Sequence, residues 1–102
     1  MFAWFRDGKV VGHYNLKQMS DTVWELNNLA VLPQCRHQGI GEALVESAFR
    51  EIRARGGRKV CIGIVEENQP LRRWYERFGF IHTGTEKFDF FPFTCGYMEK
   101  EL

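Results

Sequence analysis

Hydrophobic and polar residues change their spacing several times along the chain, and each change predicts a new element of structure. Residues 2–18 read as two extended runs on either side of Asp7 and Gly8. An Asp-Gly pair between extended runs is a hairpin signal, because glycine accepts a positive φ without steric cost. Residues 23–33 form a third extended run, which ends at Pro33. The chain therefore opens with a predicted antiparallel meander of three strands.

The middle of the chain changes to the spacing of a helix. Apolar residues recur at intervals of three and four through residues 41–57, and a pair of glycines ends this predicted helix. Residues 59–65 are a short unbroken apolar run, as expected of a strand that is buried on both faces. Asn68 can cap a second helix, which has Pro70 in its first turn and ends at Gly79.

Two more strands, at residues 80–85 and 95–102, complete the predicted order β-β-β-α-β-α-β-β. The connection between them is unusually aromatic. The predicted fold class is α+β, with a mixed, mostly antiparallel twisted sheet and a central β-α-β crossover that should be parallel and right-handed. No repeat, linker or low-complexity tract marks a boundary, so residues 1–102 are predicted to form a single domain.

The amino-acid composition argues against nucleic acid, metal ions and membranes as binding partners. A net charge of +1 lacks the basic bias that nucleic-acid-binding proteins usually show. The three cysteines include no CxxC pair, so neither a disulfide framework nor a zinc site is predicted, and a reduced, cytoplasmic setting fits best. No apolar run approaches the roughly 18 residues of a membrane span. We therefore expect a cytoplasmic protein with no metal, no membrane and no nucleic-acid partner.

The junction between the third strand and the first helix carries the strongest chemical signal. It combines Arg36 with Gly39 and Gly41 at a helix start, where about four backbone N–H groups are unpaired and the helix dipole is positive. Such a site suits an anion. The spacing excludes two familiar phosphate loops, because no lysine follows either glycine and position 44 is leucine. A tight turn that merely needs glycines remains the alternative.

Two motifs carry a resemblance to a known family. Residues 36–41 read RHQGIG, which resembles the Q/R-x-x-G-x-G/A motif of the GNAT superfamily of acyl-CoA-dependent N-acyltransferases. Asn68 and the run YERFGF at residues 75–80 resemble the family's N…YEK-GF signature. The resemblance covers nearly the whole chain. It implies a GNAT-like fold and direct transfer of an acetyl group from the cosubstrate acetyl-CoA to a primary amine, on a small molecule or a peptide.

The chain departs from the family pattern at its beginning. The family usually places a strand and two helices ahead of the first hairpin, and that part normally forms one wall of the acceptor cleft. This chain resembles a short form without them. A second interpretation is therefore a non-catalytic acyl-CoA-binding or regulatory subunit whose acceptor wall is missing or supplied by a partner. A homodimer, which would cover the exposed core, is also predicted.

The resemblance implies cofactor-binding roles for two segments and one side chain. Backbone amides of the loop would bind the pyrophosphate of acyl-CoA, and the end of the third strand would pair with the pantetheine arm. Asn68 would contact the cofactor, cap its helix, or both. The residues are Arg36, His37, Gln38, Gly39, Ile40 and Gly41 in the loop and Leu29, Ala30 and Val31 on the strand.

The resemblance also implies catalytic roles for Tyr75 and Glu25. Tyr75 matches the tyrosine that protonates the leaving thiolate, and a phenol of pKa near 10 suits that task; its alternative is a core tyrosine. Glu25 matches the glutamate base of some members, which removes the proton of the amine. On an alternating strand it shares a face with Asn27 and Leu29, and a solvent-facing glutamate is the alternative.

Other reactive side chains receive no catalytic role. His13, His37 and His82 have no partner at catalytic spacing along the sequence. Cys35 is expected to be more exposed than Cys61, but direct transfer needs no cysteine nucleophile. The aromatic segment of residues 88–93 would line an acceptor pocket or a dimer interface, since an exposed apolar patch usually marks an interaction surface. Its members are Phe88, Phe90, Phe91 and Phe93.

Overall fold

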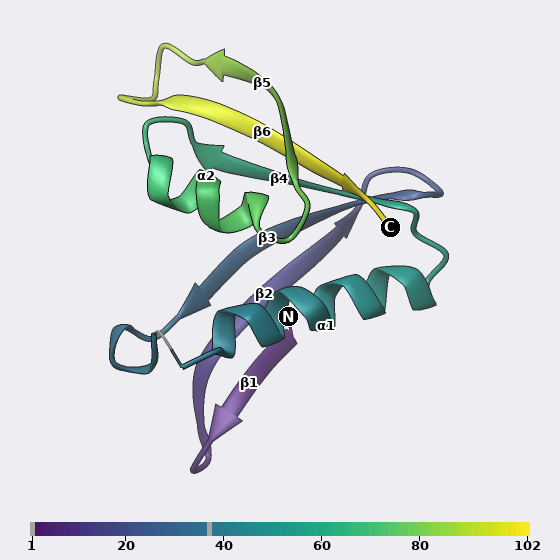
Figure 1. Ribbon diagram of the computed structural model, residues 1–102, viewed down its shortest axis with the longest axis vertical. Coiled ribbons are helices and arrows are strands. Elements are labelled where there is room, and N and C mark those ends of the chain that lie inside the picture. Colours follow the sequence, from purple (N-terminus) through teal and green to yellow (C-terminus); the bar gives the residue numbers. More distant parts are fainter. Residues whose placement is uncertain (1, 37) are drawn as a thin grey trace. The chain divides into compact units, whose positions relative to one another are not determined.

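The computed structural model describes residues 2–36 and 38–102, so the role predicted for His37 lies outside the described residues. The element order confirms the predicted β-β-β-α-β-α-β-β succession, with one added 3₁₀ turn (Figure 1). The elements are β1 (Phe2–Arg6), β2 (Lys9–Gln18), β3 (Val23–Val31), η1 (Pro33–Cys35), α1 (Ile40–Ala54), β4 (Lys59–Val65), α2 (Gln69–Glu76), β5 (Ile81–Lys87) and β6 (Thr94–Glu101).

The strands form one six-stranded, mostly antiparallel sheet in the order β1-β2-β3-β4-β6-β5, which confirms the predicted α+β class. Helix α1 connects two neighbouring strands, β3 and β4, as the predicted crossover requires. The chain divides into two compact units, residues up to Val60 with Leu102, and residues 61–101. The single domain predicted for residues 1–102 stays a prediction, and the two units are described in turn.

The first unit contains the predicted meander. Arg6 and Lys9 are paired at the end of the β1–β2 hairpin, and the two residues between them, Asp7 and Gly8, both have positive φ, of 53° and 78°. A two-residue turn of this kind has the twist of the flanking strands, which is why the Asp-Gly pair forms a hairpin here. β2 and β3 continue the antiparallel pairing.

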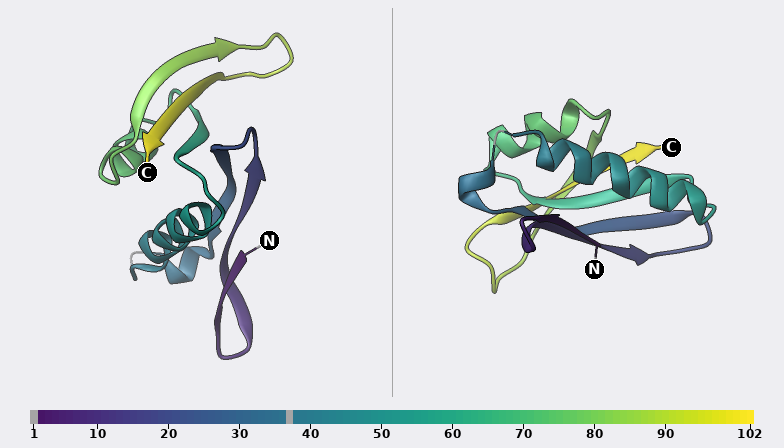
Figure 2. Two further views of the ribbon diagram at one scale, coloured as in Figure 1. Left: turned by 90° about the vertical axis from the view of Figure 1, so that its right-hand side faces the viewer. Right: turned by 90° about the horizontal axis from the view of Figure 1, so that it is seen from below.

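Helix α1 covers one face of this three-stranded sheet (Figure 2). Gly12 of β2 lets the helix approach closely, since a Cβ there would fall 2.9 Å from Leu44 Cδ1 and 3.2 Å from Ile40 Cγ2. On the same strand Tyr14 is fully buried, and its hydroxyl lies 2.7 Å from Ser47 Oγ of the helix. The buried side chains of α1 are Ile40, Leu44, Val45, Ala48, Phe49 and Ile52.

The end of α1 follows the predicted glycine pair. Gly56 N–H donates to Arg53 O at 3.1 Å and Gly57 N–H donates to Ile52 O at 2.8 Å. This pair of hydrogen bonds is the Schellman motif, which satisfies carbonyls that a helix end would otherwise leave free. The helix ends at Ala54, so the last residues of the predicted range 41–57 form this closing turn.

The second unit contains most of β4, the helix α2 and the β5–β6 hairpin. β5 extends to Lys87, two residues beyond the predicted end, because Glu86 and Lys87 continue the ladder opposite Cys95 and Thr94. In the connection that follows, Phe91 stacks on Phe93 with ring centroids 5.0 Å apart. No helix in the described part of the chain is long and apolar enough to cross a membrane.

Candidate functional site

The loop that precedes α1 is shaped by Gly39. Gly39 is the N-cap residue and has φ of +80° and ψ of 3°, a left-handed conformation that glycine adopts at little cost. Its carbonyl accepts the first helical hydrogen bond, from Ala43 N–H at 3.0 Å. Among the described residues, no side chain caps this helix start. The first N–H groups of α1 are therefore left for water or for an anion.

Side chains on either side of the loop hold it in place. Arg36 is exposed, and its Nε donates to Val31 O at 3.4 Å, which ties the guanidinium to the end of β3. Gln38 Nε2 donates to Gln34 O at 3.3 Å, and Gln38 Oε1 accepts a hydrogen bond from Arg6. No local pattern in the sequence predicts the contact of Arg6, because its partner lies 32 positions away.

Cys35, next to this loop, is buried rather than exposed, so the expectation for this thiol is wrong. The 3₁₀ turn of Pro33–Cys35 is the cause, since it turns the chain after β3 and directs this side chain inward. Cys35 N–H donates to Leu32 O at 2.8 Å within the turn.

Strand β3 contains a bulge that the sequence analysis missed. Ala30 lies opposite His13 and Asn27 lies opposite Asn15, so two residues of β3, Asn28 and Leu29, stand against one residue of β2. Asn28 has φ of +56°, which asparagine adopts more readily than most residues. A bulge leaves an extra backbone residue unpaired and is over-represented beside active sites. The Asn27-Asn28 pair is the one sequence signal that points to it.

The bulge changes which side chains share a face of β3. Side chains at every second position of a strand point to the same face of the sheet. The side chains of the residues paired with them on the neighbouring strand point to that face as well. Gly12 faces α1, so the next residue of β2 and its alternates face away from the helix. That outward face carries His13, Asn15 and Lys17 on β2 and Glu25, Asn27 and Ala30 on β3. Leu29 is not among them, so the predicted Glu25–Asn27–Leu29 face is wrong.

Glu25 lies directly opposite Lys17 on this outward face. Opposite charges on neighbouring strands stabilise the pair of strands. Glu25 is half-buried there rather than fully solvent-facing, and its pairing with Lys17 supports a structural role. The base role stays a prediction.

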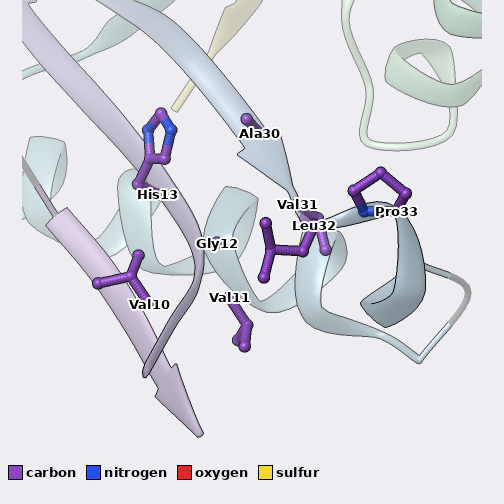
Figure 3. Close-up of a pocket in the computed structure, with 8 residues that line it drawn as sticks. All are labelled: Val10, Val11, Gly12, His13, Ala30, Val31, Leu32 and Pro33. Carbon is purple, nitrogen blue, oxygen red and sulfur yellow. The ribbon is translucent and has the colours of Figure 1, made fainter. Parts of the chain in front are cut away.

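A pocket of about 120 Å³ opens where β2 and β3 meet the loop (Figure 3). It is lined by residues 10–13 of β2 and by residues 30–33 at the end of β3, which include two of the predicted pantetheine positions, Ala30 and Val31. His13 contributes the one imidazole among the described lining residues, and its Nδ1 is buried without a hydrogen-bond partner there. Nothing in the sequence around this histidine predicts a role for it.

In the second unit, Asn68 caps α2. Its Oδ1 accepts a hydrogen bond from Leu71 N–H at 3.2 Å, which is the N-cap geometry that the sequence predicts. The capping role is confirmed, and the contact with a cofactor stays a prediction.

Tyr75 lies on the buried side of α2, with 7% of its surface exposed. Its ring meets Trp74 and Phe80 edge to face, with centroids 5.0 Å and 5.5 Å away. Burial raises the pKa of Tyr75 to about 12, because the charged phenolate would lose its hydration. The phenol is therefore protonated throughout the physiological range, but it is a weaker acid than the ordinary tyrosine that the sequence suggests.

The raised pKa makes stability depend on pH in the alkaline range. The folded state holds the phenolic proton to about 12, whereas an unfolded tyrosine releases it near 10. This contribution is fully present below about pH 10 and is lost as pH rises through 12; two pKa units correspond to roughly 2.7 kcal/mol. The free energy of unfolding, measured with urea at about pH 9 and again at about pH 12, should fall for both proteins. The fall should be smaller for Tyr75→Phe than for the wild type, by roughly 2.7 kcal/mol. Equal losses would contradict the prediction.

His82 has a partner that its sequence position does not suggest. Its Nε2 lies 2.8 Å and 3.1 Å from the two carboxylate oxygens of Glu66, in a pair that is four-fifths buried. Gly96 leaves space for the carboxylate, since a Cβ there would fall 2.6 Å from Glu66 Oε1. The expectation that His82 lacks a partner is wrong, because the partner lies 16 residues away along the chain.

Residues 1–80 match the sequence profile of the acetyltransferase (GNAT) family. The chain belongs to this family. It is 33% identical over 81 residues to a mycothiol acetyltransferase of Corynebacterium glutamicum, which covers 78% of this chain and 27% of that protein. It is 32% identical over 82 residues to an uncharacterized N-acetyltransferase of Mycobacterium bovis, which covers 80% of this chain and 53% of the relative.

Solved GNAT structures share the fold. A GNAT family acetyltransferase from Elizabethkingia anophelis with acetyl-CoA bound superposes with a TM-score of 0.89 at 22% identity, over 96% of this chain and 72% of that one. The ribosomal-protein-S18-alanine N-acetyltransferase of Escherichia coli superposes with a TM-score of 0.84 at 24% identity, over 95% and 64%. At these identities the likeness concerns the fold.

The GNAT chain described here spans between a quarter and about half of the length of the curated relatives named above. Among the described residues, no group of histidine, cysteine, aspartate and glutamate side chains is arranged to hold a metal ion.

Proposed function

We propose that this chain is an N-acetyltransferase that moves an acetyl group from acetyl-CoA directly to a primary amine. The observation that carries the proposal is the start of α1, where Gly39 leaves the first N–H groups uncapped beside the exposed Arg36 in a chain of the GNAT family. Unpaired N–H groups, the helix dipole and a guanidinium together suit a pyrophosphate.

In the proposed reaction the chain holds the cosubstrate mostly through its backbone. Amides of Arg36–Gly41 bind the pyrophosphate, and the end of β3, at Leu29–Val31, pairs with the pantetheine arm as a neighbouring strand would. The bulge at Asn28 supports this part of the proposal, because it leaves backbone groups of β3 outside the β2 ladder. Asn68 caps α2 and contacts the cosubstrate.

Tyr75 acts on the leaving group. The amine nitrogen forms a bond to the acetyl carbon, the C–S bond breaks, and the phenol gives its proton to the departing sulfur. A thiol has a pKa near 8.5, so transfer from a phenol of pKa about 12 is unfavourable once the thiolate is free. The transfer is therefore coupled to loss of a proton from the nitrogen, which is strongly acidic once it carries the acetyl group. That proton restores the phenol, so the net proton transfer runs from nitrogen to sulfur. Glu25 stays the candidate base from the sequence.

The weak acidity of Tyr75 also favours a second candidate, a non-catalytic acyl-CoA-binding or regulatory subunit. In that case the ring of Tyr75 would have a structural role, packing against Trp74 and Phe80 in the second unit.

Binding and turnover separate the two candidates. Isothermal titration calorimetry measures acetyl-CoA binding, and release of the CoA thiol is followed with DTNB over a panel of amines. Two amines of the panel are acceptors named for structurally similar acetyltransferases, a peptide with an N-terminal alanine and an aminoglycoside. A polyamine and a lysine-containing peptide complete the panel. Turnover of an amine would support the enzyme. Binding without turnover of any of them would support the second candidate, and absence of binding would contradict both.

Two further parts of the proposal concern location and assembly. The three cysteines are free thiols, which supports a reducing, cytoplasmic setting. The homodimer stays a prediction, for which light scattering of the purified chain is the measurement.

A further inference from the structure

The residues paired with His13 on the two neighbouring strands have small side chains, so the imidazole ring has space around it. It is paired with Ala3 of β1 on one side and with Ala30 of β3 on the other, so an alanine flanks the imidazole on each neighbouring strand. In Figure 3 the imidazole lies beside Ala30 at the edge of the pocket of about 120 Å³.

The Nδ1 atom of His13 is a polar atom without a partner in this setting. It is buried, and no hydrogen-bond partner exists for it among the described residues. A buried nitrogen that is left unpaired costs free energy, and the imidazole gains a partner from outside the chain only if it turns this nitrogen toward the pocket that it lines. The pocket exceeds the roughly 10–15 Å³ that one water needs, and is therefore large enough for a bridging water or a small amine.

The same pair of residues, His13 and Ala30, adjoins the backbone to which the pantetheine arm of acetyl-CoA is assigned above. Ala30, directly opposite His13, belongs to the segment Leu29–Val31, and the bulge at Asn28 begins in the next row of the ladder. A group placed in the pocket therefore meets His13 from one strand and this segment from the other.

We propose that His13 is the proton acceptor for the amine substrate, a role that rests on the proposed function. The amine arrives as an ammonium ion, with a pKa near 10 if it resembles lysine, and must lose a proton before it attacks. The imidazole of His13, turned toward the pocket, takes that proton directly or through a water. The nitrogen then forms its bond to the acetyl carbon, the sulfur leaves with the proton of Tyr75, and a second proton from nitrogen restores the phenol. His13 releases its proton to solvent.

The charged groups on this face of the first unit lie farther along the strands. Lys17 and Glu25 oppose each other, and the Asn15–Asn27 row separates them from the His13–Ala30 row. β1 contributes Ala3 to this position and no charged side chain. His13 is thus the titratable side chain of the described unit that lines the pocket.

His13→Gln tests the proposal, because glutamine keeps a polar side chain but does not titrate. The probes are acetyl-CoA and whichever amine of the panel the wild type acetylates fastest. A base accepts a proton only in its unprotonated form, so the wild-type kcat/KM for the amine should fall toward acid pH. His13→Gln should lower this constant about 100-fold or more and flatten the acid limb. Affinity for acetyl-CoA should be unchanged.

Two further variants make the result specific. His13→Ala should regain activity when imidazole is added to the solution, which a merely structural histidine would not do. Lys17→Gln removes a charge from the same face and should keep the wild-type rate and pH profile.

Three results would overturn the proposal. If the wild type acetylates an amine and His13→Gln keeps its rate and pH profile, the proposal fails and the proposed function stands. If Glu25→Gln removes the acid limb and His13→Gln does not, the glutamate is the base. If the wild type binds acetyl-CoA but acetylates no amine of the panel, the proposed function fails first and the role of His13 with it.

Discussion

Gly41→Val is expected to weaken acetyl-CoA binding about 100-fold or more while the fold remains intact. Gly41 lies in the first turn of α1, directly after the buried Ile40. Side chains of a helix tilt toward its N-terminus, so a valine there would lean over the free N–H groups. Hydrogen bonds to a charged group contribute about 1.5–3 kcal/mol each, and each 1.4 kcal/mol is tenfold in affinity. Loss of two such bonds therefore gives the expected effect.

Gly84→Val is the matched control for this experiment. A Cβ at Gly84 has no heavy atom within 4 Å, and the residue lies within β5, where a valine suits the extended backbone. Calorimetry should show unchanged acetyl-CoA affinity for this variant, and both variants should retain the wild-type circular dichroism spectrum. Wild-type affinity in Gly41→Val would contradict the assignment of the loop to the pyrophosphate.

Tyr75→Phe is expected to lower kcat for CoA release about 100-fold and to leave acetyl-CoA affinity within about twofold. The ring of Tyr75 fills its site between Trp74 and Phe80, and phenylalanine keeps these edge-to-face contacts. Only the hydroxyl is removed, and with it the donor for the leaving sulfur. Because burial holds the pKa of this hydroxyl at about 12, the donor is present at every physiological pH.

The measurement is the initial rate of CoA release at saturating acetyl-CoA, with the amine that the wild type acetylates fastest. Tyr14→Phe is a useful control, since it removes another buried hydroxyl, the one that lies 2.7 Å from Ser47 Oγ. It should reduce stability by about 1 kcal/mol, as for an ordinary hydrogen bond, and leave kcat unchanged. An unchanged kcat in Tyr75→Phe would contradict its acid role.

Together the two variants separate binding from chemistry. The loop variant should change the affinity for acetyl-CoA, and the tyrosine variant should change the rate at saturation. A loss of affinity in both would instead indicate that Tyr75 contributes to cosubstrate binding.

Local patterns in the sequence determined the elements and the family of this protein. Alternation, helical spacing and capping act between residues a few positions apart, so the hairpin at Asp7-Gly8, the Asn68 cap and the glycine end of α1 all agree with the prediction. The RHQGIG loop and the run that begins at Tyr75 are equally local, which is why the GNAT family was recognisable before its structure was known.

Tertiary structure decided the features that depend on distant partners. The bulge at Asn28 is defined by its pairing with β2, and it places Ala30 rather than Leu29 on the face of Glu25. Burial of Cys35, the contact of Arg6 with Gln38 and the pairing of His82 with Glu66 likewise join residues far apart in the chain or depend on what surrounds them. The pKa of Tyr75 follows from desolvation, which only the folded chain produces. Sequence alone thus located the glycine loop that is proposed to bind the cosubstrate, while the environment of each reactive side chain came from three-dimensional contacts.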